Sequence, residues 1–143
     1  MKIRTDWKAV NFQEIIDLYA AVGWSAYTND IQGLVLCLSQ STYVAFHVED
    51  HKVVGLVRSL SDGVSIHFLQ DILVHPDHQG KGIGKALMES ALQRFKKCRT
   101  HLLMTDDNEN QKKFYESLGY KNTKTLTKIP LNCFVKMNRV ELS

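Results

Sequence analysis

The feature that most constrains the fold is a change of pattern within residues 64–95. Residues 64–74 (VSIHFLQDILV) are rich in β-branched and apolar side chains and predict a long strand. Pro76 keeps the following loop out of a helix. A glycine-rich turn then opens a helix with one apolar face, made of Ile83, Ala86, Leu87, Ala91, Leu92 and Phe95. Such a strand–turn–helix unit requires a fold that packs helices on a sheet.

The remaining segments predict helices first and an antiparallel meander after them. The expected helices are residues 11–22, a second one capped by Asn29 with a stripe of Ile31, Leu34, Val35 and Leu38, and one from about 106–108 to Leu118. The expected strands are 42–48 and 52–60 as a hairpin, 101–105, a short one near 121–126, and 132–138. We therefore expect an α+β or mixed α/β fold in which the strand–helix units add a strand parallel to its neighbour.

Composition and length limit the classes of protein to consider. The chain has 143 residues, of which 44% are hydrophobic, with no linker, repeat or low-complexity tract, so we expect one domain over 1–143. The net charge of +3 is too small to indicate a nucleic-acid partner. No apolar run is long enough to span a membrane, and we expect a cytoplasmic protein. Cys37, Cys98 and Cys133 are widely spaced, which predicts neither a metal site nor a disulfide framework.

The glycine-rich turn has the properties of an anion-binding site. Gly80, Gly82 and Gly84 let the backbone come close to a diphosphate, and the first turn of the helix offers free N–H groups. Lys81 and Lys85 add positive charge nearby. The spacing matches neither the G-x-G-x-x-G dinucleotide fingerprint nor the P-loop. The alternative is that the glycines only form a tight turn.

Two motifs resemble those of the GNAT N-acetyltransferase superfamily. Residues 79–84 (QGKGIG) fit the [RQ]-x-x-G-x-[GA] signature and follow a strand that ends in Val-His-Pro. Asn108 lies seven residues before Tyr115, and the segment closes at Gly119-Tyr120, as in the N-x-x-A-x-x-x-Y-x-x-x-G-[FY] pattern. Gln111 departs from that pattern, because it stands where the family commonly has alanine.

The resemblance implies a central, mostly antiparallel twisted sheet with a splayed parallel strand pair, flanked by helices. Acetyl-CoA would lie between strands 64–74 and 101–105. The backbone of Leu73 and Val74 would pair with the pantetheine arm, and Asn108 and Phe114 would line the far wall. The backbone that binds the pyrophosphate would come from Gln79, Gly80, Lys81, Gly82, Ile83, Gly84 and Lys85. Leu73, Val74 and Phe114 are also core candidates without a ligand.

The catalytic residues follow from the same resemblance. Tyr115 stands at the position of the family's usual general acid, which protonates the departing thiolate. The base is open between Asp71, His67 and water; the two side chains lie four apart on one strand, hence on one face unless a bulge intervenes. Trp24 and Tyr27 lie in the helical part that usually caps the acceptor pocket, where they could flank the amine, but for Trp24 we expect core packing instead.

The sequence as a whole predicts an N-acetyltransferase that transfers the acetyl group of acetyl-CoA to a primary amine by direct attack on the thioester. Its expected partner is a small-molecule amine, without nucleic acid, membrane or metal. The alternative is a non-catalytic acyl-CoA-binding sensor of the same fold. The identity of the amine is open, as is the choice between a monomer and a homodimer formed through the last strand.

Overall fold

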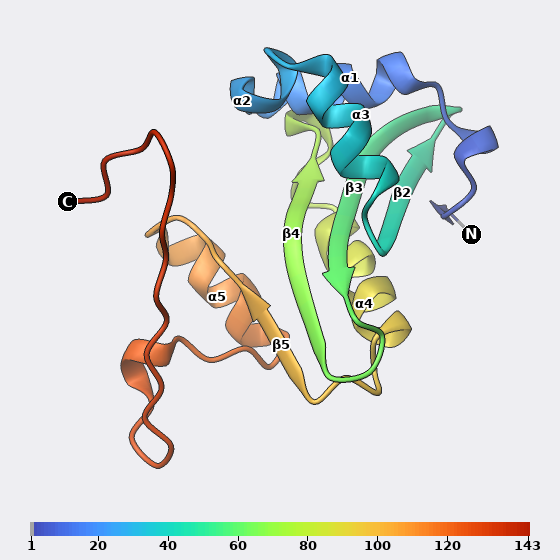
Figure 1. The fold of residues 1–143 in the computed structure, drawn as a ribbon. Coiled ribbons are helices and arrows are strands. Elements are labelled where there is room, and N and C mark those ends of the chain that lie inside the picture. The colour runs from blue at the N-terminus through green and yellow to red at the C-terminus, as the bar shows by residue number, and fades with distance from the viewer. Residues whose placement is uncertain (1) are drawn as a thin grey trace. The chain divides into compact units, whose positions relative to one another are not determined.

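A five-stranded sheet dominates the computed structural model, which describes residues 2–143 (Figure 1). The strands lie in the order of the sequence: β1 (Ile3–Arg4), β2 (Tyr43–Glu49), β3 (Lys52–Ser61), β4 (Ile66–Val74) and β5 (Thr100–Leu103). Neighbours are antiparallel except β4 and β5, which are parallel. The predicted mixed sheet with one parallel pair is therefore confirmed. The sheet belongs to the first of two compact units into which the chain divides, which ends at Met104.

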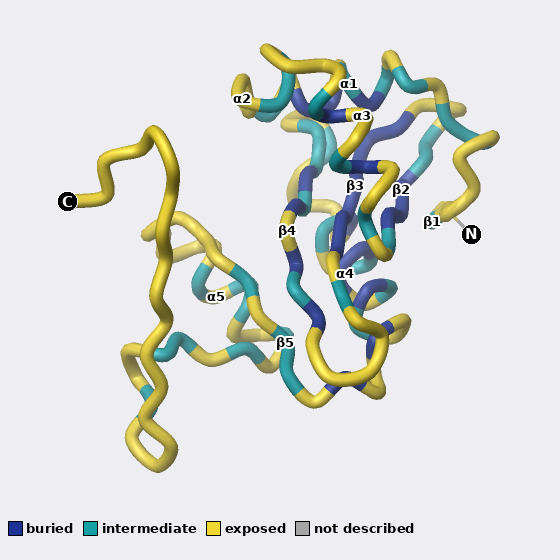
Figure 2. The backbone as a smooth tube through the Cα atoms, in the orientation of Figure 1, coloured by how far each residue is buried: buried dark blue, intermediate teal, exposed yellow. Residues whose placement is uncertain are grey.

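Helices cover both faces of this sheet (Figure 1). One face carries α1 (Phe12–Ala21), α2 (Ser25–Thr28) and α3 (Ile31–Ser39), and the other carries α4 (Ile83–Arg94). Leu18 and Leu34 belong to the first core, together with Leu56 from β3. On the α4 side, a Cβ on Gly55 would lie 2.9 Å from the side chains of both Ile83 and Leu87. Helices on both faces explain why β3 is buried along most of its length (Figure 2).

Local capping shifts two of the predicted boundaries. The cap of α3 is Asp30, whose carboxylate accepts a hydrogen bond from the Gly33 N–H, whereas Asn29 ends α2. The strand β4 starts at Ile66 rather than at residue 64, because the Asp62 carboxylate accepts hydrogen bonds from the N–H groups of Val64, Ser65 and Ile66. These bonds hold the segment as a turn. The strand β1 and the helix α2 were not predicted, because both are too short to show a period.

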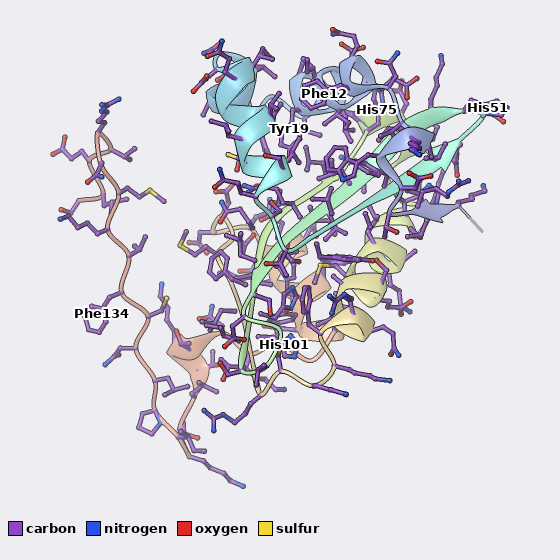
Figure 3. All side chains as sticks on the ribbon, turned by 45° about the vertical axis from the view of Figure 1, so that its right-hand side comes forward. Phe12, Tyr19, His51, His75, His101 and Phe134 are labelled. Atoms are coloured by element: carbon purple, nitrogen blue, oxygen red, sulfur yellow. The ribbon has the colours of Figure 1, made fainter. Side chains whose placement is uncertain are left out.

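The second unit, Thr105–Ser143, holds the helix α5 (Glu109–Ser117) and a short 3-10 helix at Thr123–Thr125. The predictions of strands near 121–126 and at 132–138 are wrong, because residues 121–143 form no strand. Apolar residues alternate over 132–138, but no ladder partner is present, and a lone strand has no stability of its own. This terminal segment is exposed, and Phe134 projects from it (Figures 2 and 3). The prediction of one domain over 1–143 stays untested.

Within residues 2–143, no helix combines the length and the apolar character that crossing a membrane would demand.

Candidate functional site

The parallel strands β4 and β5 separate part-way along β4. They pair from Ile66 opposite Thr100 to Leu69 opposite Leu103, where β5 ends. Strand β4 continues to Val74 and keeps its pairing with β3 as far as Val74 opposite Gly55. Residues 70–74 therefore have one unpaired edge, on the side where β5 has ended. Unpaired N–H and C=O groups on such an edge can bind an extended ligand in the manner of an added strand.

A tight turn connects the end of β4 to α4. Pro76–His78 forms a 3-10 helix, and the Gln79 side chain donates a hydrogen bond from Nε2 to the Val74 carbonyl over 3.2 Å. Gly80 and Gly82 have φ angles of +76° and +81°, in the left-handed region that favours glycine. A Cβ on either glycine would meet no atom of the protein within 4 Å. Glycine is therefore required by the backbone conformation, and the space beside the turn is open to a ligand.

The N-terminus of α4 presents free donors to this space. The first hydrogen bond of the helix is donated by the Ala86 N–H to the Gly82 carbonyl over 3.0 Å. The amides of Ile83, Gly84 and Lys85 precede that bond and belong to the unpaired first turn. Gly82 is the N-cap and supplies no side chain that could occupy these amides. The turn thus fits a pyrophosphate-sized anion, as predicted from the glycines.

The side chains predicted for this site divide into core and surface. Leu73 and Ile83 are buried, so both have the core role considered for Leu73. The Ile83 amide remains for a ligand, but the backbone groups of Leu73 face β3, as the bond from the His75 N–H to the Val54 carbonyl shows, so the predicted pairing of Leu73 with a ligand is wrong. Lys81 and Lys85 are exposed, and Lys85 Nζ lies 3.9 Å from Glu89 one helical turn on. The ammonium of Lys81 is free to approach an anion. The cofactor-binding role of these residues stays a prediction.

Asp71 lies in a buried hydrogen-bond network beneath α1 and α2. Its carboxylate is 3% exposed and accepts hydrogen bonds from Arg58 Nε at 2.7 Å, Tyr19 Oη at 2.9 Å and Tyr27 Oη at 2.9 Å. Burial, followed by the charge of Asp71, raises the pKa of both Tyr19 and Tyr27, so both phenols stay protonated as donors. Tyr19 belongs to α1, and Figure 3 shows it among the helices above the sheet. The predicted role of Asp71 as the base stays untested, but its surroundings are those of a carboxylate fixed by three donors.

His67 lies on the opposite face of the sheet from Asp71. Asp71 contacts Arg58, whereas His67 Nε2 lies 2.8 Å from Oγ of Ser59, the next residue of β3. Because successive residues of a strand point to opposite faces, the two candidate bases do not share a face. The expectation of a common face is wrong. The reason is a bulge in β4, the exception named with that expectation. Arg58 pairs with Asp71 but Ser59 pairs with Leu69, so one extra residue of β4 reverses the faces beyond this point.

His67 is buried and pairs with the half-buried His101. Its Nδ1 lies 2.9 Å from Nδ1 of His101, and its ring stacks on Phe95 with the centroids 4.5 Å apart. Burial, and to a lesser extent His101, lowers the pKa of His67 from 6.5 to about 4. Figure 3 shows His101 at the opposite end of the sheet from His75, which follows the β4 end where the strands have separated. His67 is thus a neutral core group at physiological pH.

We expect His67 to make the free energy of unfolding decrease as the pH is lowered. The unfolded chain binds a proton at His67 near pH 6.5 and the folded chain only near pH 4, so the free energy of unfolding falls as the pH drops through this window and levels off below it. Urea unfolding followed by fluorescence from pH 7.5 to 4 measures the slope. His67→Gln should flatten it, while His51→Asn, at an exposed turn, should not. Burial also lowers the pKa of His47, so part of the slope of unfolding free energy against pH remains in His67→Gln. A slope equal to that of the wild type would contradict the assignment of this pH dependence to His67.

The second unit, Thr105–Ser143, contains the remaining predicted site residues, and their contacts are described within that unit. Asn108 is the N-cap of α5, and its side chain accepts hydrogen bonds from the N–H groups of Asn110 and Gln111. Phe114 and Tyr115 are half-buried, with ring centroids 5.1 Å apart, and Tyr115 packs edge-on against Tyr120 at 6.1 Å. Burial raises the pKa of Tyr115 to about 12. The phenol is therefore protonated over the whole physiological range, as a proton donor must be.

Arg58 is the important site residue that the sequence analysis missed. Its side chain is 6% exposed and forms the only buried ion pair of the described chain, with Asp71. The available signal was an arginine within the apolar strand pattern KVVGLVRSL, since a charged residue at a buried strand position requires a partner. Trp24 is 37% exposed and packs against Tyr19 and Tyr27, so it belongs to the rim of this cluster rather than to the core. No group of three metal-ligating side chains occurs within residues 2–143.

Comparison with known proteins decides the family of this site. The family described as "Acetyltransferase (GNAT) domain" matches residues 16–140, which include both motifs and most of each unit. The chain belongs to the GNAT acetyltransferase family. A solved GNAT-family acetyltransferase from Streptococcus pneumoniae is 32% identical to this GNAT domain, with a TM-score of 0.78 and 96% of each chain covered. The GNAT-like fold is thus confirmed.

The matches to curated relatives cover a smaller share of each relative. L-amino acid N-acyltransferase MnaT of Escherichia coli is 29% identical over 114 residues, which are 72% of this chain and 66% of the relative. A putative acetyltransferase of Gibberella zeae is 35% identical over 82 residues, 55% of this chain and 45% of the relative. This GNAT chain therefore spans between about half and two thirds of the length of these relatives.

Proposed function

We propose that this chain transfers the acetyl group of acetyl-CoA to a primary amine of a small molecule. One observation carries the proposal: the unpaired edge of β4 at residues 70–74 leads directly into the open turn and free amides at the start of α4. An extended arm that ends in a pyrophosphate matches this order of features. Acetyl-CoA has such an arm, and supplies the acyl group as an activated thioester.

The chain's own groups would bind and orient this substrate. The Val74 N–H would pair with an amide carbonyl of the arm along the unpaired edge, whereas the backbone groups of Leu73 face β3. The amides of Ile83, Gly84 and Lys85 would donate to the pyrophosphate, with positive charge from Lys81. A backbone N–H near Val74 would stabilise the carbonyl oxygen as negative charge develops on it during attack by the amine.

Tyr115 would supply the proton for the leaving sulfur. The amine nitrogen bonds to the acyl carbon, the carbon–sulfur bond breaks, and the thiolate takes a proton from the Tyr115 hydroxyl. Support comes from the position of Tyr115 in the N-x-x-x-x-x-x-Y motif and from its raised pKa of about 12, which keeps the donor protonated. The phenolate is afterwards reprotonated by the proton that the amine has released, through solvent.

The names of two relatives support a small amine as the acceptor. One is an L-amino acid N-acyltransferase, and another, from Schizosaccharomyces pombe, is a glucosamine 6-phosphate N-acetyltransferase that is 32% identical over 88 residues. A histone acetyltransferase of Glycine max also matches, over 50% of this chain and 31% of its own length. The acceptor panel should therefore include amino acids, amino sugar phosphates and a lysine-rich peptide.

Isothermal calorimetry with acetyl-CoA, followed by a thiol-release assay against that panel, tests the proposal. We expect a dissociation constant in the micromolar range and free thiol with at least one amine. Binding without turnover on any amine would favour an acyl-CoA sensor. Absence of binding at millimolar acetyl-CoA would mean that the glycine turn is only a turn, and the proposed function would fail.

A further inference from the structure

The position where β4 leaves β5 coincides with a one-residue bulge. Arg58 pairs with Asp71 and Ser59 with Leu69, so Gln70 is the extra residue on β4. The pairing of β4 with β5 ends at Leu69, immediately before this residue. A bulge bends its strand and increases the local twist. The bulge therefore lies at the hinge between the paired half of β4 and the half with an unpaired edge.

The ion pair of Arg58 and Asp71 lies at this bulge, and each nitrogen and oxygen of the two charged groups has a hydrogen-bond partner. The Asp71 carboxylate accepts from Arg58 Nε and from the two tyrosine hydroxyls described above. The Arg58 guanidinium also donates from Nη2 to Tyr27 Oη over 2.9 Å and from Nη1 to Ser41 Oγ over 3.4 Å. The partners come from α1, α2 and the segment after α3. A buried ion pair holds only when its remaining donors and acceptors are satisfied in this way.

This network fixes the register of β4 because the two faces of the sheet are chemically different. Moving β4 by one residue would turn Asp71 from the guanidinium toward the face covered by α4. That face contains Leu87, Met88 and Phe95 at the sheet, all of them buried. An unpaired carboxylate there would carry a large desolvation cost. The bulge at Gln70 is thus the register in which the charge keeps its partner.

We infer that Asp71 is a positioning residue: through Arg58, Tyr19 and Tyr27 it holds the bulge that separates β4 from β5, and so sets the geometry of the acyl-CoA edge. The inference deepens the proposed function and rests on it for the ligand. It replaces proton transfer by Asp71, since all three donors compete for the lone pairs that a base would use. Tyr27 is half-buried and packs against Trp24, so it connects the buried network to the protein surface.

Two variants and one control test the inference. Asp71→Asn removes the charge, and Tyr27→Phe removes one donor and the acceptor of Arg58 Nη2 without deleting a buried charge. Tyr43→Phe is the matched control, because its hydroxyl donates to Ser90 Oγ over 3.2 Å on the α4 side of the same sheet. Amide hydrogen exchange without ligand, acetyl-CoA affinity by calorimetry, and the pH profile of kcat/KM are measured for all three.

We expect amide exchange in residues 66–74 and 100–103 to become faster by about tenfold or more in both test variants, with residues 43–49 unchanged. Acetyl-CoA affinity and KM should worsen by about tenfold, while the acid limb of the pH profile keeps its midpoint. Tyr43→Phe should change none of these. A lost acid limb with unchanged exchange and affinity would assign Asp71 as the base and overturn the inference.

The outcomes also separate the inference from the proposed function. If the unmodified protein does not bind acetyl-CoA, the proposed function fails, and the hydrogen exchange still reports whether Asp71 holds the bulge. If the protein binds acetyl-CoA but neither variant changes local exchange or affinity, the inference fails while the proposed function stands. If Asp71→Asn does not fold, Tyr27→Phe alone decides between these results.

Discussion

Gly82→Val should reduce the affinity for acetyl-CoA by more than about a hundredfold, which corresponds to about 2.7 kcal/mol of binding free energy. Gly82 has a φ angle of +81° as the N-cap of α4. A β-branched residue rarely adopts this conformation, so the turn must change and re-aim the amides of Ile83 and Gly84. A branched side chain would also occupy the open space beside the turn, where the pyrophosphate is proposed to lie.

Gly63→Val provides the matched control for the backbone effect. Gly63 has a φ of +78° in the turn between β3 and β4, and a Cβ there also meets no atom within 4 Å. Both substitutions should lower the free energy of unfolding by roughly 1–2 kcal/mol, the cost of a left-handed conformation. Only Gly82→Val should lose acetyl-CoA in calorimetry. Equal affinities in the two variants would remove the anion site from the α4 turn.

The first unit could be predicted largely because its elements are long and have clear periods. The β-branched and aromatic residues of β2 and β3, the strand β4 and the apolar face of α4 each indicate one structure, and the resemblance that residues 79–84 carry then implies the parallel pair. The residues of the anion turn follow from glycine chemistry, because left-handed backbone at Gly80 and Gly82 is a local property. Such features need no knowledge of distant contacts.

What the sequence did not predict depends on contacts between distant residues. The bulge at Gln70 is stabilised by an arginine on another strand and by tyrosines 44 to 52 residues away from Asp71 along the chain, and no local pattern records this. The separation of Asp71 from His67 follows from that bulge. The prediction of a strand at 132–138 failed for the same kind of reason. Alternation of apolar residues indicates two faces, but a strand also needs a neighbouring strand to pair with.

Tyr115→Phe should lower kcat by about a hundredfold, at the lower end of what general acid catalysis contributes, and leave acetyl-CoA affinity within about twofold. The substitution removes one hydroxyl from a half-buried ring that keeps its packing on Phe114 and Tyr120. Without this donor the thiolate must leave unprotonated or take its proton from water. Steady-state kinetics with the best amine of the panel, together with calorimetry, separates the effect on kcat from the effect on binding.

Tyr120→Phe is the control in the same unit, since the Tyr120 hydroxyl is buried without a hydrogen-bond partner and its ring touches Tyr115. Removing an unsatisfied hydroxyl should not reduce stability, and kcat should stay within about twofold. The alkaline limb of the wild-type pH profile should not report Tyr115 below about pH 12, because burial raises its pKa to about 12. If Tyr115→Phe turns over at the wild-type rate, then water or another group protonates the thiolate, and the tyrosine of the second motif is a packing residue.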